Sequence, residues 1–136
     1  SLNQNKNVSP IFIENIAISN HKKEAFLNLE SGLGSAYIQN DNSKSSIEVK
    51  CDTLENIIIK HDIKKISGLK IDVEGHEDKA LAPFLENMNI SYYPKLILIE
   101  YTSKISWDKD IIFLLKSKGY NEIFRTKANM ALQLKI

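Results

Sequence analysis

A nine-residue run from Leu69 to Glu77 constrains the fold of this chain more than any other feature. Its first part alternates apolar and polar side chains, which predicts a strand over 69–73. Gly75 then permits a sharp turn, and apolar residues recur at helical spacing from Glu77 to Met88. A strand that leads through a glycine into a helix is typical of α/β folds. The run therefore predicts an α/β fold with polar residues at the carboxyl end of a strand.

The rest of the chain supplies further strands and helices in an order that fits the same class. The stretch from Ser31 to Ser46 is rich in Gly, Ser and Asn and predicts a long loop. Pro83 predicts a kink or a break in its helix, and residues 127–129 predict the turn of a hairpin. Strands are expected over 11–18, 26–29, 47–50, 69–73, 95–101, 121–126 and 130–136, and helices from a cap at 52 or 53 to 60, over 77–88, and from 108 or 109 to 118.

Acidic residues gather where two of these strands end. Asp72 and Glu74 would share one strand face, with Cα atoms about 6.6 Å apart, and Glu100 closes the next strand. If those strands are neighbours, the three carboxylates line one crevice at the edge where open α/β sheets bind ligands. His76 follows directly and is a candidate base or ligand. The structural alternatives are a satisfied buried Asp72, a solvated Glu74 and a surface-exposed His76.

Composition excludes several classes of function. The 136 residues are enough for a single domain over 1–136. A net charge of +1 carries no electrostatic footprint for nucleic acid or an anionic membrane. No apolar run approaches the roughly 20 residues of a membrane span, and no leader peptide is expected. The single Cys51 suits a reducing compartment, so we expect a cytoplasmic protein with a small-molecule or glycan partner.

The run Leu69-Lys70-Ile71-Asp72-Val73-Glu74-Gly75-His76-Glu77 resembles the signature of the FkbM family of methyltransferases. Residues 15–19 resemble the third core strand of that family, and 53–55 its Thr-Leu-Asp segment with Glu55 in place of Asp. Residues 98–100 resemble a strand that ends in glutamate, and 115–120 a closing Leu-Gly-Tyr segment. The resemblance covers residues 11–120 and implies a Rossmann-like class I methyltransferase sheet, mostly parallel with an antiparallel C-terminal hairpin. It also implies an S-adenosylmethionine-dependent O-methyltransferase that acts on a hydroxyl of a sugar or secondary metabolite.

The resemblance implies roles for individual residues and no resident metal. Either Glu74 or His76 would bind the acceptor hydroxyl or take its proton, as a positioned carboxylate or imidazole can. The implied residues are Asp72 and Ala17 for the cofactor, Asp72, Glu74 and His76 for catalysis, and Glu100 and Tyr101 for the acceptor.

The chain departs from the family at its beginning. No segment before Ile11 resembles the first strand, glycine-rich turn and helix that hold the cofactor, or the second strand whose acid holds the ribose. We therefore expect a sheet that lacks its first strands, with an open edge beside strand 69–73 that favours a homo-oligomer. Two alternatives stand beside the methyltransferase. One is a metal-dependent, glycosyltransferase-like enzyme that uses the Asp72-x-Glu74 pair, and the other is a non-catalytic fragment that acts by association.

Overall fold

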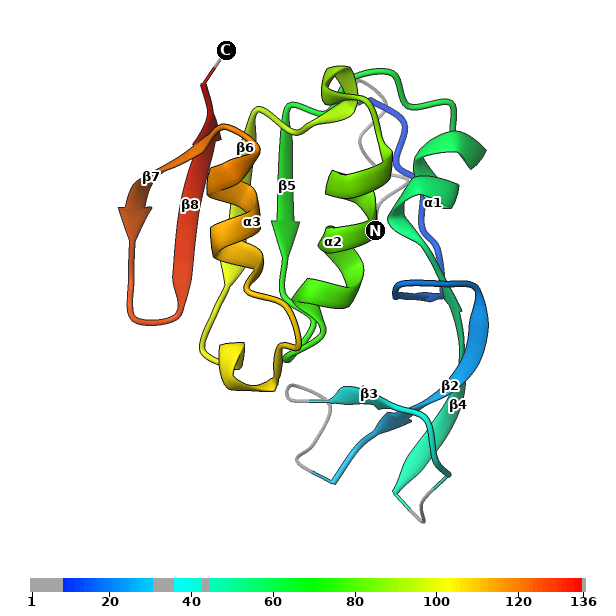
Figure 1. The fold of residues 1–136 in the computed structure, drawn as a ribbon. Coiled ribbons are helices and arrows are strands. Elements are labelled where there is room, and N and C mark those ends of the chain that lie inside the picture. Colours follow the sequence, from blue (N-terminus) through cyan, green and yellow to red (C-terminus); the bar gives the residue numbers. More distant parts are fainter. Residues whose placement is uncertain (1–8, 31–35, 43–44, 136) are drawn as a thin grey trace.

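The computed structural model describes residues 9–30, 36–42 and 45–135, which form three α-helices and two four-stranded sheets. The first sheet lies at the lower right of Figure 1 and the second at its left. Two 3₁₀ turns, Ile90–Tyr92 and Lys104–Ser106, flank β6. The elements are β1 (Ala17–Ile18), β2 (Lys23–Asn28), β3 (Tyr37–Gln39), β4 (Ser46–Asp52), α1 (Leu54–Lys60), β5 (Gly68–Ile71), α2 (Glu77–Asn87), β6 (Leu96–Glu100), α3 (Ile111–Ser117), β7 (Tyr120–Arg125) and β8 (Asn129–Leu134).

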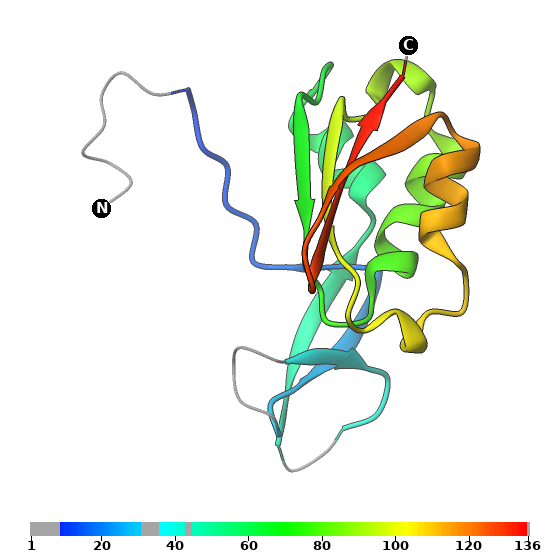
Figure 2. The ribbon, with the colours of Figure 1, turned by 90° about the vertical axis from the view of Figure 1, so that its left-hand side faces the viewer.

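The second sheet has the strand order β5-β6-β8-β7. β5 and β6 are parallel, with Ile71 opposite Ile99, and α2 lies in the crossover between them, as a parallel pair requires. β8 pairs antiparallel with both β6 and β7, so the predicted C-terminal hairpin is confirmed. Helices α2 and α3 both cover one face of this sheet (Figure 2). The largest buried side chains between these layers include Phe84, Leu85, Ile97, Ile99, Leu115, Tyr120 and Leu132.

Local chemistry sets the helix ends much as the sequence predicts. The Oγ1 of Thr53 accepts a hydrogen bond from the Asn56 backbone N–H at 3.2 Å and caps α1. Gly119, with φ 98°, follows the end of α3 in the left-handed conformation typical of that position. Of the kink or break predicted at Pro83, the break is wrong, because α2 continues through this residue. Burial of Leu81 and Leu85 on either side offsets the missing backbone hydrogen bond.

The prediction of one mostly parallel sheet is also wrong for the described residues. Four of their six strand pairings are antiparallel, and only β1–β4 and β5–β6 are parallel. The first sheet has the order β1-β4-β2-β3 and includes no strand of the second. β2 pairs antiparallel with both β3 and β4, and residues 29–36, which join β2 to β3, are fewer than the dozen or more that a parallel crossover requires.

The N-terminal part of the first sheet differs most from expectation. Of the strand predicted over 11–18, only Ala17 and Ile18 pair with another strand. The residues before them turn to α1 instead, where the Phe12 ring stacks on His61 and Glu14 contacts the same imidazole at 2.6 Å. The predicted loop over 31–46 contains β3, while residues 31–35 and 43–44 lie outside the described part of the chain.

Several element boundaries also differ from the predictions, among them the start of β2, which is Lys23 instead of Phe26. The strand predicted over 69–73 ends at Ile71, which leaves Asp72 and Val73 outside it. The strand predicted over 130–136 ends at Leu134, and Ile136 lies outside the described residues. β5 forms an edge of the second sheet, so the expected open edge is present among the described strands. None of the described helices is long and apolar enough to cross a membrane.

Candidate functional site

The chain makes a tight turn immediately after β5. The His76 backbone N–H donates to the Val73 carbonyl at 3.2 Å, and the two residues between them, Glu74 and Gly75, have φ values of 49° and 91°. Positive φ at both central residues is the pattern of a type I′ turn. It is unfavourable for Glu74, and such strain tends to persist at functional sites. Asp72 and Glu74 therefore do not share a strand face, because Glu74 belongs to this turn.

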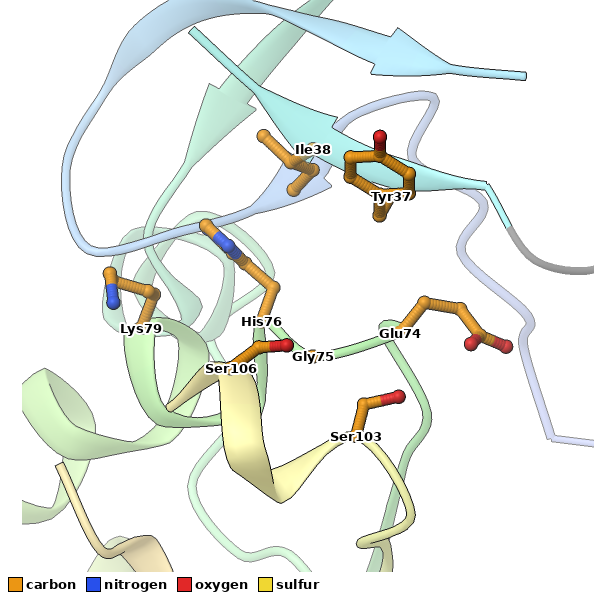
Figure 3. A pocket seen from close by; sticks show the side chains of 8 residues that line it. All are labelled: Tyr37, Ile38, Glu74, Gly75, His76, Lys79, Ser103 and Ser106. Atoms are coloured by element: carbon orange, nitrogen blue, oxygen red, sulfur yellow. The ribbon is translucent and has the colours of Figure 1, made fainter. Parts of the chain in front are cut away.

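A cavity of about 410 Å³, here called the serine cavity, opens against the turn. Figure 3 shows Tyr37 and Ile38 of β3 on one side of it, and Ser103 and Ser106 on the other. The Gly75 backbone lies so close to the second side that an added Cβ would meet the Ser106 Cβ at 3.2 Å. Among the described residues, the lining consists of Tyr37, Ile38, Glu74, Gly75, His76, Lys79, Ser103 and Ser106.

A second cavity of about 420 Å³, here called the apolar cavity, lies between the first sheet and the segment that follows β5. Its aliphatic walls come from β1, β2 and β3, and the segment after β5 contributes two carboxylates. Glu74 and Ile38 line both cavities, so the boundary between the cavities, here called the shared wall, includes these two residues. In the part of the chain that the structure describes, its lining consists of Ile16, Ala17, Ile18, Leu27, Ala36, Ile38, Asp72, Val73 and Glu74.

The Glu74 carboxyl is the acidic group at this shared wall. Partial burial raises its pKa above the usual value, and the neighbouring carboxylates of Asp72, Glu100 and Glu77 raise it further. A carboxylate surrounded by other negative charges binds protons and cations more readily than one in water. Glu74 can therefore accept a proton from a group bound in either cavity.

His76 lies at the base of the serine cavity, just before α2. Its Nε2 is 2.9 Å from the Oγ of Ser19, which is fully buried after β1. Burial lowers the pKa of His76 to about 4, and the positive charges of Lys79 and Lys23 act in the same direction. The imidazole is consequently neutral at pH 7, so it forms hydrogen bonds there without carrying charge.

The two residues predicted to contact a cofactor meet in the apolar cavity. Ala17 and Asp72 both line it, although 55 positions separate them in the sequence. The Asp72 carboxylate also receives a hydrogen bond from Lys70 Nζ at 3.0 Å. The Asp72 side chain is 38% exposed and that of Lys70 60%, so the pair contributes little to stability. The Asp72 carboxylate is therefore accessible to a ligand.

The residues predicted to bind the acceptor are placed differently from one another. Glu100 ends β6 beside β5, as expected, and is buried. Its Oε1 accepts hydrogen bonds from the backbone and side chain of Thr102, and its Oε2 has no partner in the described structure. Tyr101 instead lines a separate cavity with Trp107, and its hydroxyl donates to the Thr126 carbonyl at 2.7 Å. Glu100 lies near enough to Glu74 to raise its pKa, but neither Glu100 nor Tyr101 lines either cavity described above, so the prediction that Glu100 shares a crevice with Asp72 and Glu74 is wrong for these two cavities.

Sequence reasoning missed several residues of the serine cavity. Ser103 and Ser106 belong to a polar segment between β6 and α3, and Tyr37 belongs to the segment predicted as a loop. Lys79 also lines the cavity and contacts Asp108 at 2.5 Å and Asp78 at 3.2 Å. No motif marks these residues, because they meet only when β3 and the Lys104–Ser106 turn fold over the start of α2. In the described ranges, no group of three or more His, Cys, Asp or Glu side chains could hold a metal ion.

Comparison with known proteins gives one result. A family model described as the methyltransferase FkbM domain matches residues 2–122, which is most of the chain. No curated protein and no solved structure matches in the corresponding comparisons.

Proposed function

Because this chain belongs to the methyltransferase FkbM domain family, we propose that it is an S-adenosylmethionine-dependent O-methyltransferase whose acceptor is a hydroxyl of a sugar or secondary metabolite. The observation that carries the proposal is the pair of adjoining cavities that share Glu74 and Ile38. A group transfer between two bound molecules needs two compartments that meet at one point. Glu74 lies at that point and has an acid–base side chain.

The residues of the apolar cavity fit part of S-adenosylmethionine. The carboxylates of Asp72 and Glu74 suit its ammonium, sulfonium and ribose hydroxyl groups, and the aliphatic walls, with Ala17, suit its apolar parts. In the proposed arrangement, Asp72 and Ala17 hold the cofactor. When bound, the cofactor would supply a methyl group from a positively charged sulfur, and the breaking of that carbon–sulfur bond would leave a neutral thioether.

The serine cavity would hold the acceptor. Its lining includes the hydroxyl-bearing residues Tyr37, Ser103 and Ser106, which can exchange hydrogen bonds with the hydroxyls of a sugar-like molecule. Glu74 accepts the proton that the acceptor hydroxyl loses as its oxygen forms the new bond to carbon. His76, neutral and in contact with Ser19, orients the acceptor and leaves proton removal to Glu74.

Calorimetric titration with S-adenosylmethionine tests the cofactor part of this proposal. Asp72→Asn should weaken binding about tenfold or more, because a charged hydrogen-bond acceptor is lost. Asp62→Asn is a matched control, since Asp62 pairs with the exposed Lys64 on the surface. No binding by the folded wild-type chain, or equal binding by Asp72→Asn, would contradict the assignment. Transfer of a labelled methyl group to hydroxylated acceptors then tests the reaction itself.

The proposal extends to a partner and a location. β5 presents an open edge, and a second copy of the chain is the proposed occupant because the unpaired backbone groups of an edge strand favour pairing with a strand of another chain. Sedimentation velocity should show a concentration-dependent dimer, and a chain that stays monomeric at all concentrations would overturn this.

A cytoplasmic location rests on the lone, buried Cys51. No observation on the described residues favours the metal-dependent alternative.

A further inference from the structure

Glu77 is the first residue of α2 and is fully buried, although it carries a carboxylate. Burial of such a group is unfavourable unless hydrogen bonds replace its water. Its Oε1 accepts from the backbone N–H groups of Val73 at 3.0 Å and Gly75 at 3.4 Å. Its Oε2 accepts from Trp107 Nε1 at 2.8 Å. Both oxygens are therefore satisfied by donors from outside the helix.

These donors belong to two segments that adjoin at the edge of the serine cavity, on the side opposite β3 (Figure 3). Val73 and Gly75 flank Glu74 in the strained turn, while Trp107 follows the 3₁₀ turn that carries Ser106. The Glu77 carboxylate lies between the segments and bonds to each of them. The backbone N–H groups of Val73 and Gly75, the two neighbours of Glu74 in the chain, both donate to the Glu77 carboxylate. These two hydrogen bonds thus stabilise the positive φ of Glu74.

We infer that Glu77 is a positioning residue that fixes Glu74 and the Lys104–Ser106 turn relative to each other, so that the shared wall and the serine cavity form together. The catalytic consequence of this inference rests on the proposed function, whereas its geometric part does not. A carboxylate is required because it accepts hydrogen bonds on both oxygens. A glutamine amide accepts hydrogen bonds only on its oxygen. Its N–H₂ group would face either the backbone amides or the indole N–H, and both of these are donors that cannot accept a hydrogen bond.

Amide hydrogen exchange tests the geometric part without any ligand. In Glu77→Gln, the Val73 and Gly75 amides should exchange about tenfold faster or more, because the turn opens locally. Adding Trp107→Phe should restore much of this protection, since the glutamine oxygen can then face the backbone. Trp107 is the only tryptophan of the chain, so a shift of its fluorescence in Glu77→Gln reports the loss of the same contact.

Asp78→Asn is a matched control. Asp78 is the next residue of α2 and equally buried, but its Oδ2 accepts from the backbone N–H groups of Asp108 and Lys109. It does not bond to the turn, so the exchange of Gly75 should stay at the wild-type rate. Faster exchange of Gly75 in Asp78→Asn to the same extent would show a general loss of stability and would overturn the inference.

Steady-state kinetics test the catalytic part. We expect Glu77→Gln to lower kcat about tenfold or more while KM for the methyl donor changes little, because only the position of Glu74 is disturbed. Unchanged Gly75 exchange, or unchanged kcat, in folded Glu77→Gln overturns the inference. If that variant does not fold, Trp107→Phe replaces it, because it removes the hydrogen bond between the indole and Glu77. The same two measurements are made on it, and unchanged exchange of the Gly75 amide together with unchanged kcat overturns the inference. Absence of methyl transfer by the wild type would contradict the proposed function. Amide exchange would still test whether Glu77 fixes the turn that contains Glu74.

Discussion

The imidazole Nε2 of His76 lies 2.9 Å from the Oγ of Ser19, a contact that joins segments 57 residues apart. Ser19 follows β1 of the first sheet, and its backbone N–H donates to the Asp52 carbonyl at 2.8 Å. His76 precedes α2, which packs on the second sheet. The contact therefore ties the two sheets together beside the candidate site.

Loss of this contact should be measurable in stability. Ser19→Ala leaves a ring nitrogen of His76 without its partner, and we expect the free energy of unfolding to fall by about 1 kcal/mol. Urea denaturation at pH 7 measures the change. Ser117→Ala is a suitable control, because that exposed hydroxyl bonds only within α3, and its effect should stay within about 0.5 kcal/mol. Equal effects of the two substitutions would contradict the role of Ser19.

The pKa of His76 predicts how stability depends on pH. Its pKa is about 4 in the folded protein, below the ordinary value of 6.5, so the unfolded chain binds the proton more strongly. The His76 contribution to stability is therefore complete above pH 6.5 and falls progressively as the pH is lowered from 6.5 towards 4. His76→Asn should lose this part of the pH dependence. Urea midpoints at pH 7 and pH 5, compared between the two proteins, measure it, and an identical pH dependence would refute the assignment.

Glu74 should control the pH dependence of methyl transfer. Because its pKa is raised, kcat/KM should increase with pH through a value above that of an ordinary carboxyl group, as Glu74 becomes able to accept a proton. Glu74→Gln should abolish this increase of kcat/KM with pH and lower kcat about 100-fold. Glu86→Gln provides the control, since Glu86 pairs with Lys109 on the surface. A Glu74→Gln enzyme with the wild-type profile would show that another group takes the proton.

The close approach at Gly75 predicts a difference between two glycine substitutions. Gly75 and Gly119 have similar positive φ values, 91° and 98°, so alanine costs about 1–2 kcal/mol of backbone strain at either position. At Gly75 the new Cβ would also meet the Ser106 side chain at 3.2 Å, whereas at Gly119 the nearest atom, of Leu134, is 3.6 Å away. Gly75→Ala should therefore be the more destabilising substitution by urea denaturation. Combination with Ser106→Gly should recover the difference, and failure to recover it would exclude the steric explanation.

Much of the second sheet could be predicted from the sequence, because its signals are local. The spacing of Leu81 and Leu85 predicts the buried face of α2, and Thr53 and Gly119 predict helix ends through their own backbone and side-chain chemistry. The same local reasoning failed where contacts distant in sequence decide the outcome. Phe12 and Glu14 contact residues at the end of α1 instead of pairing in a strand, and no property of residues 11–14 alone predicts these contacts.

The candidate site divides in the same way. The run from Leu69 to Glu77 by itself determines the chemical groups present: the carboxylates, the imidazole, and the glycine that makes the turn possible. Only the tertiary structure decides their surroundings, because Ser19, Ile38 and Ser106 arrive from distant segments when the two sheets and the Lys104–Ser106 turn pack against the start of α2. Burial and neighbouring charge then set the pKa values of Glu74 and His76. These are properties of the packed environment, which no local pattern of residue types contains.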